Sequence, residues 1–370
     1  MTDITPVAAE PGELAMPVDP TATWQIDEVA AQAALDSLRA AKVVLLPTHQ
    51  NVDADGLASP LAMCHALAGF GVAAHPVVTD GELPSNLRFL PGVEKVLVYG
   101  RDELPAYDML CLIDCADRKR LGDFAKDDPS RLDGRVPMIN IDHHVTNDRF
   151  GIVNIVIPEA SSAAEIVTEV LRCWNVSPTP AIAQCLLAGI FGDTLGLRTP
   201  STTPRTMRTA ADLVDAGGNT TPIIDALFRL KPRSTICLWS HALRNIHWIG
   251  PIIWTEMTQE GFKSCGAEVS EAEGLINFLA GTEGSRAAVI LYENEDRSSW
   301  RVSLRSLEEN VDVAKIAAVF GGGGHPRAAG ARIEGGPAEK EAFLHRIAAL
   351  AAALPPRVGV AATGTPIDAS

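Results

Sequence analysis

Several features that mark particular classes of protein are missing from this sequence of 370 residues. Acidic residues outnumber basic ones by 46 to 31, giving a formal net charge of −15. This balance argues against a protein that grips long duplex DNA by neutralising many phosphates. No apolar run reaches the roughly 18 to 20 residues that span a bilayer, and residues 1–20 lack the basic and apolar regions of a secretory signal. The sequence therefore predicts a cytoplasmic protein without a membrane segment.

The seven cysteines show no metal-binding pattern. None belongs to a C-x-x-C pair, so a zinc ribbon is not expected. Most lie within apolar runs, and we expect reduced thiols in the core of a cytosolic protein. They are Cys64, Cys111, Cys115, Cys173, Cys185, Cys237 and Cys265.

The composition indicates a globular protein of two domains. Hydrophobic residues make up 46% and charged residues 21% of the chain, and a chain of this length can bury two ordinary cores. We predict a disordered tail over 1–24, a first α/β domain over 25–200, a helical linker over 201–232, a smaller α/β domain over 233–354 and a disordered tail over 355–370.

Apolar runs alternate with helical patterns in the first domain, which predicts a doubly wound, mainly parallel sheet. Ligands of such sheets bind at the carboxyl ends of the strands. The predicted strands are 42–47, 73–78, 93–98, 109–113 and 135–141, and the predicted helices are 25–41, 57–70, 161–174 and 181–191. In the second domain, 289–292 and 300–304 are predicted strands, and 275–279, 313–320 and 338–354 are predicted helices.

Acidic and histidine residues follow these apolar runs. Asp142, His143 and His144 end the strand 135–141, where such polar groups are costly unless a cation or a reaction uses them. His49, Asp53 and Asp55 follow the first strand, Asp114 follows 109–113, and Asp193 follows the helix 181–191.

Each cluster also has a structural interpretation. The Asp142–His144 triplet can form a satisfied polar corner, Asp55 can cap the next helix with Asp53 assisting its dipole, and Asp193 can be a loop residue. Helix capping accounts for one acidic residue in the first cluster, but not for His49 together with both Asp53 and Asp55.

Together these residues suit a pair of divalent metal ions. Two ions roughly 3.5–4 Å apart favour in-line displacement at phosphorus, because they acidify a water molecule and spread the developing charge. The absence of cysteine from the clusters disfavours a zinc–thiolate site and suits Mn²⁺ or Mg²⁺.

Five motifs in this order resemble the DHH phosphoesterases over about residues 40–350. They are H-x-x-x-D-x-D at 49–55, D-x-x-D at 114–117, D-H-H at 142–144, G-D-T at 192–194 and F-G-G-G-G-H-P-R-A-A-G at 320–330. The last is similar to the substrate-binding domain called DHHA1 in that family.

The resemblance implies a role for each matching residue. His49 and Asp53 would hold one ion and Asp55 the other, Asp114 would bridge them, and His143 and Asp193 would complete the second site. His144 would face the scissile phosphate, and Asp142 would orient the imidazoles.

The resemblance also assigns a phosphate site to the second domain. The amides of Gly321, Gly322, Gly323 and Gly324 would cradle a phosphate, with His325 and Arg305 as donors. A glycine run alone is usually a flexible turn, and this one is not the G-x-G-x-x-G of a dinucleotide site.

The length is similar to that of the nano-RNase/pAp-phosphatase group. This implies a metal-dependent hydrolase, with Mn²⁺ expected before Mg²⁺, acting as an exoribonuclease on short oligonucleotides to release 5′-mononucleotides. It would also act as a 3′-nucleotidase on 3′-phosphoadenosine 5′-phosphate. The alternatives are a cyclic or linear dinucleotide phosphodiesterase and a non-catalytic nucleotide-binding regulator. Expected partners are short RNA or DNA oligonucleotides or phosphorylated nucleotides, no membrane, and a second copy of the chain in a homodimer.

Overall fold

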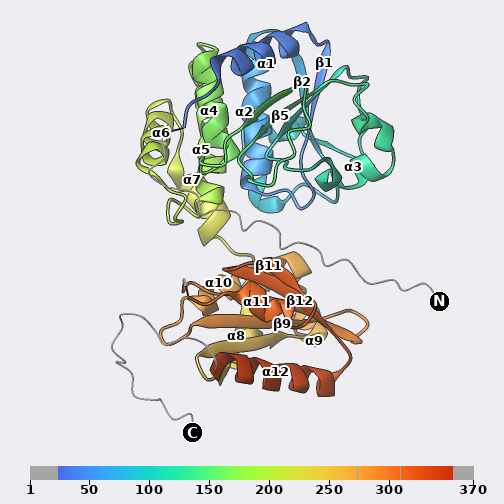
Figure 1. Cartoon of the computed structure of the whole chain (residues 1–370), viewed down its shortest axis with the longest axis vertical. Helices are drawn as coiled ribbons and strands as arrows, with labels where there is room; N and C mark the ends of the chain where they lie inside the picture. Colours follow the sequence, from blue (N-terminus) through green and yellow to red (C-terminus); the bar gives the residue numbers. More distant parts are fainter. Residues whose placement is uncertain (1–23, 273, 309, 353–370) are drawn as a thin grey trace, which may run out of the picture. The chain divides into compact units, whose positions relative to one another are not determined.

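A computed structural model describes residues 24–352 except 273 and 309. These residues form two compact units, with the boundary between Leu230 and Lys231 (Figure 1). The predicted tails lie outside the described residues, apart from Trp24, which is buried in the core of the first unit. Within the described ranges, no helix is long and apolar enough to cross a membrane.

The first unit contains a six-stranded sheet in which all paired strands are parallel, as predicted. The strands are β1 Val43–Pro47, β2 Ala73–Val78, β3 Leu97–Val98, β4 Met109–Ile113, β5 Met138–Asp142 and β6 Val153–Val156. Their order is β3-β2-β1-β4-β5-β6, so the direction of winding reverses between β1 and β4. The neighbouring loops at such a reversal form a crevice for ligands.

The prediction differs from the structure at both edges of this sheet. The predicted strand 93–98 is mostly the 3₁₀ turn η2, Val93–Lys95, followed by the two-residue β3. The edge strand β6 was not predicted, because its four residues include the polar Asn154 and are buried only in part.

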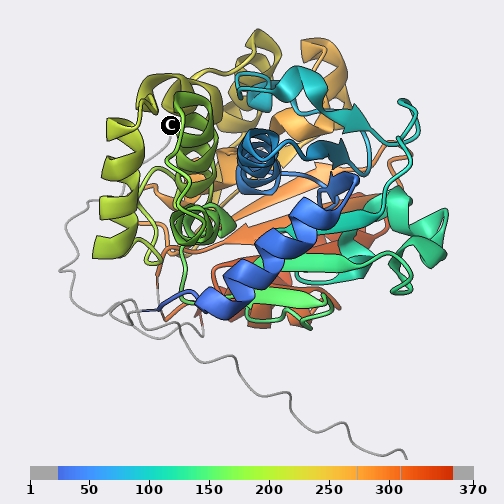
Figure 2. The ribbon, with the colours of Figure 1, turned by 90° about the horizontal axis from the view of Figure 1, so that it is seen from above.

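Helices cover both faces of the sheet (Figures 1 and 2). One face packs against α1 Glu28–Ala40, α2 Ala54–Gly69, α4 Ala163–Cys173 and α5 Pro180–Asp193. The other packs against the 3₁₀ turns η3 Arg118–Arg120 and η4 Pro129–Leu132 and the short helix α3 Gly122–Lys126. Along β1, Val44 and Leu46 face the first layer while Leu45 faces the second. Burial on both faces explains why the strands are apolar throughout.

The segment predicted as a linker, 201–232, is helical over most of its length. It contains α6 Pro204–Asp215, α7 Thr220–Ile224 and the π-helical turn η5 Asp225–Arg229. Helix α6 packs against α4 and α5, and η5 contacts the 3₁₀ turn η1, Ser85–Leu87. Residues up to Leu230 therefore belong to the first unit.

The second unit is a smaller α/β unit, as predicted. Its sheet has the order β11-β12-β10-β9-β8-β7, with β8 and β9 parallel and the other pairs antiparallel. The strands are β7 His247–Ile249, β8 Ile252–Met257, β9 Ala287–Glu293, β10 Ser299–Arg305, β11 Gly323–His325 and β12 Ala328–Glu334. Helices α8 Arg233–Arg244, α9 Gln259–Cys265 and α10 Leu275–Ala280 cover one face, and α11 Val313–Ala318 and α12 Pro337–Ala352 cover the other.

The expectation of seven reduced thiols is wrong for one pair. Cys237 and Cys265 form a disulfide that joins α8 to α9. These cysteines are 28 residues apart, and only the packing of the two helices brings them together. The other five cysteines are free thiols.

Candidate metal centre

The predicted ligands of the first unit converge at the carboxyl edge of its sheet. His49 follows β1, Asp114 follows β4, and Asp142 is the last residue of β5. Since β1, β4 and β5 are parallel neighbours, these three ends meet at the same edge. The amino end of α2 adds Asp53 and Asp55, and the carboxyl end of α5 adds Asp193.

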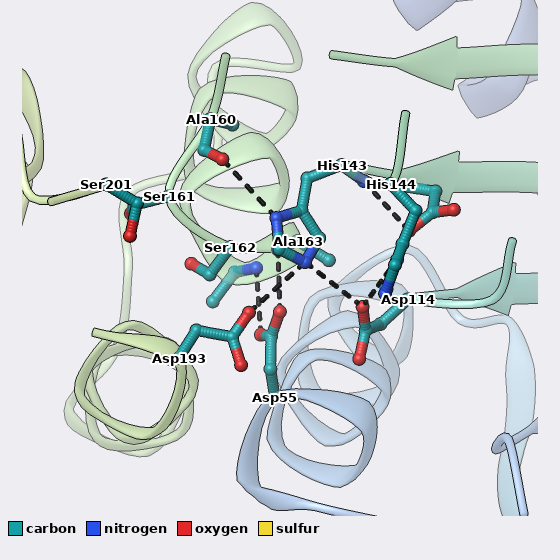
Figure 3. Close-up of polar contacts among 12 residues, drawn as sticks. Asp55, Asp114, His143, His144, Ala160, Ser161, Ser162, Ala163, Asp193 and Ser201 are labelled. Atoms are coloured by element: carbon teal, nitrogen blue, oxygen red, sulfur yellow. Dashed lines mark hydrogen bonds and ion pairs between the residues drawn. The ribbon is translucent and has the colours of Figure 1, made fainter. Parts of the chain in front are cut away.

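Two groups of ligand-type atoms lie side by side, and Asp114 contacts both. In the first group, His49 Nε2 lies 3.6 Å from Asp53 Oδ1 and 3.3 Å from Asp114 Oδ2. In the second, His143 Nε2 lies 3.2 Å from Asp193 Oδ2 and 3.5 Å from Asp114 Oδ1. Asp55 belongs to the second group, and Figure 3 shows its carboxylate pointing toward His143.

Backbone carbonyls set the orientation of both imidazoles. His49 Nδ1 lies 2.9 Å from the Gln50 oxygen, and His143 Nδ1 lies 3.3 Å from the Ala160 oxygen (Figure 3). A carbonyl only accepts hydrogen bonds, so Nδ1 carries the proton in each neutral ring. Each Nε2 therefore presents its lone pair to the carboxylates, which is the arrangement of a metal-binding histidine.

Two buried atoms of this centre fit the ligands of a cation. His49 Nε2 and Asp114 Oδ1 are buried and have no hydrogen-bond partner among the described residues. Such orphaned polar atoms are costly and require an explanation. All the donors are carboxylate oxygens and imidazole nitrogens, which are the ligands of divalent ions such as Mn²⁺.

The pKa values of residues at this centre are shifted by burial and by the crowding of carboxylates. Burial lowers the pKa of His49, but the carboxylates of Asp114 and Asp53 outweigh it and raise the pKa to about 10. Burial raises the pKa of Asp193 to about 6, although His143 opposes the shift. Burial and then the charges of Asp193 and Asp114 raise the pKa of Asp55. A divalent ion offsets this repulsion between carboxylates.

Asp55 also has a structural role that the sequence did not reveal. Its Oδ2 accepts a hydrogen bond from the Ala163 amide at 2.6 Å, and its Oδ1 accepts from the Ala164 amide at 3.0 Å. These amides form the first turn of α4, so Asp55 caps a helix distant in sequence (Figure 3). Its own helix α2 is capped by Asp53, which accepts from the Gly56 amide at 2.9 Å. The capping interpretation thus holds for Asp53 at α2 and not for Asp55.

Asp142 positions His144. The Asp142 side chain is fully buried, and its Oδ1 accepts a hydrogen bond from His144 Nδ1 at 2.8 Å. Its Oδ2 accepts from Asn147 Nδ2 at 2.6 Å. Asn147 was not predicted, because an asparagine in a loop is usually a turn residue. The opposite edge of the His144 ring remains available, and the side chain is 34% exposed.

Two hollows border the centre and share Asp193. The larger measures about 480 Å³, and its lining includes His143, His144, Ser161 and Ser201. Figure 3 shows these serines on the side of Asp193 away from Asp114. The smaller measures about 170 Å³ and includes Asp53 and Phe228 in its lining. A ligand bound at the centre can therefore extend in two directions.

The predicted phosphate donors lie together in the second unit. In the strand register, Arg305 pairs with Ala328, and Ala328 pairs with His325. Side chains directly opposite in antiparallel strands share a face, so Arg305 and His325 flank the small Ala328. Burial lowers the pKa of Arg305, and no carboxylate pairs with it among the ion pairs of the described residues.

The glycine run is shaped by close packing. A Cβ on Gly322 would collide with the Gly330 carbonyl oxygen, and a Cβ on Gly324 would lie 2.5 Å from the Ala328 oxygen. The amides of Gly321 and Gly322 donate to the last carbonyls of α11 at 3.1 and 3.0 Å. Gly321 and Gly323 are the two members of the run at which a Cβ would meet nothing within 4 Å.

Comparison with known proteins identifies both units. Residues 43–190 match the DHH family, N-terminal domain, and residues 261–353 match the DHHA1 domain. The bifunctional oligoribonuclease and PAP phosphatase NrnA of Thermus thermophilus is 32% identical over 300 residues, covering 79% of this chain and 84% of that protein. The Bacillus subtilis protein of the same name is 26% identical over 302 residues, covering 78% and 89%.

The fold has a counterpart among crystal structures. An exopolyphosphatase-related protein from Bacteroides fragilis superposes with a TM-score of 0.79 at 22% identity, covering 90% of this chain and all of that one. At 22% identity, the similarity between the two proteins shows a shared fold. The two domain matches and the 32% identical relative show that this chain belongs to the DHH family, with a DHHA1 domain following its DHH domain.

Proposed function

We propose that this protein is a metal-dependent phosphoesterase that hydrolyses short oligoribonucleotides to 5′-mononucleotides and 3′-phosphoadenosine 5′-phosphate to AMP. The observation that carries the proposal is the pair of ligand groups joined by Asp114. The names of three relatives that each span more than three quarters of the chain supply the substrate class.

The ligand groups suit two divalent ions, Mn²⁺ before Mg²⁺. His49 and Asp53 would hold one ion, Asp55, His143 and Asp193 the other, and Asp114 both. When bound, such ions acidify a water molecule and offset the charge on the phosphoryl oxygens.

His144 is the side chain proposed to contact the scissile phosphate. Its hydrogen bond to Asp142 holds the ring in place and leaves Nε2 available. The Nε2 edge of the ring is the part that would meet a phosphoryl oxygen of the substrate. We assign Asp142 a positioning role through this contact.

In the second unit, we propose that Arg305 and His325 bind a substrate phosphate. Their side chains flank Ala328 on one face of the sheet. A half-buried guanidinium with no carboxylate partner in the described part of the chain favours an anion. Gly322, Gly323 and Gly324 would let the substrate approach the backbone, with the open position at Gly323.

The other candidate functions have less support. Three relatives that each span more than three quarters of the chain carry the oligoribonuclease and phosphatase name, so a dedicated role as a cyclic or linear dinucleotide phosphodiesterase is not favoured. A non-catalytic regulator would usually have lost a ligand, whereas all seven ligand-type residues, from His49 to Asp193, are present and grouped.

The proposed function is tested by a panel of substrates with Mn²⁺ present. We expect fast hydrolysis of an RNA dinucleotide and of 3′-phosphoadenosine 5′-phosphate, and slow hydrolysis of a long RNA. The products should be 5′-mononucleotides and AMP, identified by chromatography. Preference for a cyclic dinucleotide would contradict the assignment, as would metal-loaded protein that hydrolyses none of these compounds.

His325→Ala should weaken substrate binding without removing metal. We expect KM for the dinucleotide to rise about tenfold with little change in kcat, because the variant loses one charge-assisted hydrogen bond to the substrate. The control is His345→Ala, which alters a histidine of the same unit whose side chain is 78% exposed. Loss of metal from His325→Ala, measured by elemental analysis, would show that its role was misassigned.

A further inference from the structure

The smaller hollow at the metal centre has an aromatic wall. Besides Asp53 and Asp193 it is lined by Ala54, Gly192, Leu227 and Phe228. Pockets for drug-sized ligands measure roughly 300–1,000 Å³, so a hollow of about 170 Å³ suits one planar ring system. The larger hollow has no phenylalanine, tyrosine or tryptophan in its described lining. Phe228 is therefore the ring that a group bound between Asp53 and Asp193 would meet.

A π-helical turn positions Phe228. Helix α7 continues into η5, where the Leu230 amide donates to the Asp225 oxygen at 2.8 Å, five residues earlier. Such a turn inserts one extra residue into the helix and is frequent at functional sites. The Phe228 side chain is half-buried, so packing holds the ring while part of it stays accessible.

The loop after Asp193 lies close to the Phe228 ring. Leu195, Gly196 and Leu197 have φ angles of 49°, 72° and 64°. Left-handed leucines are uncommon, and surrounding contacts must hold them. Here the Leu197 amide donates to Thr194 Oγ1 at 3.0 Å, which closes the turn.

This strained turn brings Arg198 to Phe228. The guanidinium carbon of Arg198 lies 5.6 Å from the ring centroid of Phe228, within the range of a cation–π contact. Arg198 Nε donates to the Leu195 carbonyl at 2.6 Å, which anchors the side chain. No hydrogen bond engages its terminal nitrogens within the described ranges. A Cβ on Gly196 would lie 3.5 Å from the Phe228 ring, at ordinary van der Waals distance, so the loop passes close to the ring.

We propose that a nucleobase of the substrate stacks on Phe228, with Arg198 beside it, while the adjoining phosphate lies at the metal centre. This inference rests on the proposed function and names a base-binding subsite for it. Stacking on an aromatic side chain is worth roughly 5- to 150-fold in affinity per base and is sequence-tolerant, because every base has a π face. With a net charge of −15, the chain gains little from long-range attraction of phosphates, so contact with the base would add affinity that the overall charge does not provide.

The test compares binding of two ligands without turnover. The first is an adenylyl dinucleotide with a methylenephosphonate linkage, and the second is the same compound lacking both bases. Dissociation constants are measured by calorimetry on the Mn²⁺-loaded full chain. Phe228→Ala should reduce the preference for the base-containing ligand about tenfold, within the range of one stacking contact, and Phe228→Tyr should retain it.

Phe70→Ala provides a matched control. Phe70 is also half-buried and has Arg39 at 5.5 Å from its ring, but it lies at the far end of α2. That helix of 16 residues separates it from Asp53 by about 24 Å. This control should leave the preference unchanged.

The possible outcomes separate the two proposals. If Phe228→Ala raised the dissociation constants of both ligands by the same factor, or changed neither, the preference for the base-containing ligand would be unchanged. This result would overturn the subsite while leaving the proposed function intact. If Phe228→Ala reduced the preference but the wild-type protein hydrolysed no nucleotide, the subsite would be supported and the proposed function contradicted.

Discussion

Asp114→Asn is expected to lower kcat for an RNA dinucleotide by at least about a thousand-fold, since a ligand shared by two ions stabilises the transition state by several kcal/mol. Asp114 lies between the two ligand groups, and its backbone has a φ of 60°. Asparagine tolerates this left-handed conformation and keeps the size of the side chain. The loss therefore reports the missing charge and ligand rather than a distorted backbone. Steady-state rates and metal content measured by elemental analysis give the result.

Asp123→Asn is the control for this experiment. It makes the same change on an aspartate that is 57% exposed and, among the residues that the structure describes, forms an ion pair only with Lys126 in α3. Its rate and metal content should equal those of the wild type. If metal-loaded Asp114→Asn kept a substantial fraction of wild-type activity, the two-ion assignment would be wrong.

Asp55→Ala should destabilise the fold as well as abolish activity. It removes the acceptor of three hydrogen bonds, from the Ala163 and Ala164 amides and from Ser59 Oγ at 2.7 Å. Each buried donor left without an acceptor costs about 1–3 kcal/mol. We expect the free energy of unfolding to fall by about 3 kcal/mol or more. Urea unfolding in excess chelator measures this without any contribution from metal binding.

Asp193→Ala is the matched comparison. Its carboxylate is also a proposed ligand, but it accepts no backbone hydrogen bond in the described part of the chain, and it lies at the carboxyl end of α5. A negative charge is unfavourable there, so in chelator this variant should be as stable as the wild type. Both variants should lose activity, and only Asp55→Ala should speed hydrogen exchange at the first turn of α4. Equal stability of the two would contradict the capping role of Asp55.

Much of the fold was predictable because its signals are local. A buried parallel strand such as β4, MLCLI, is a short apolar run bounded by polar residues, and the helices show regular apolar spacing. The positions of His49, Asp114 and Asp142 at strand ends followed from the same pattern. The edge strand β6 and the 3₁₀ turn η2 were misjudged, because short edge elements lack such a pattern.

The sequence by itself determined the type of ligand, the order of the motifs and the sheet edge at which they meet. These depend on residue chemistry and on the periodicity of neighbouring residues. Only the tertiary structure decided which atoms interact across the chain. Asp55 caps a helix 108 residues away, the Ala160 carbonyl orients His143 from 17 residues away, and Phe228 borders the hollow beside Asp53. Such contacts arise when separate elements pack together, and no local pattern encodes them.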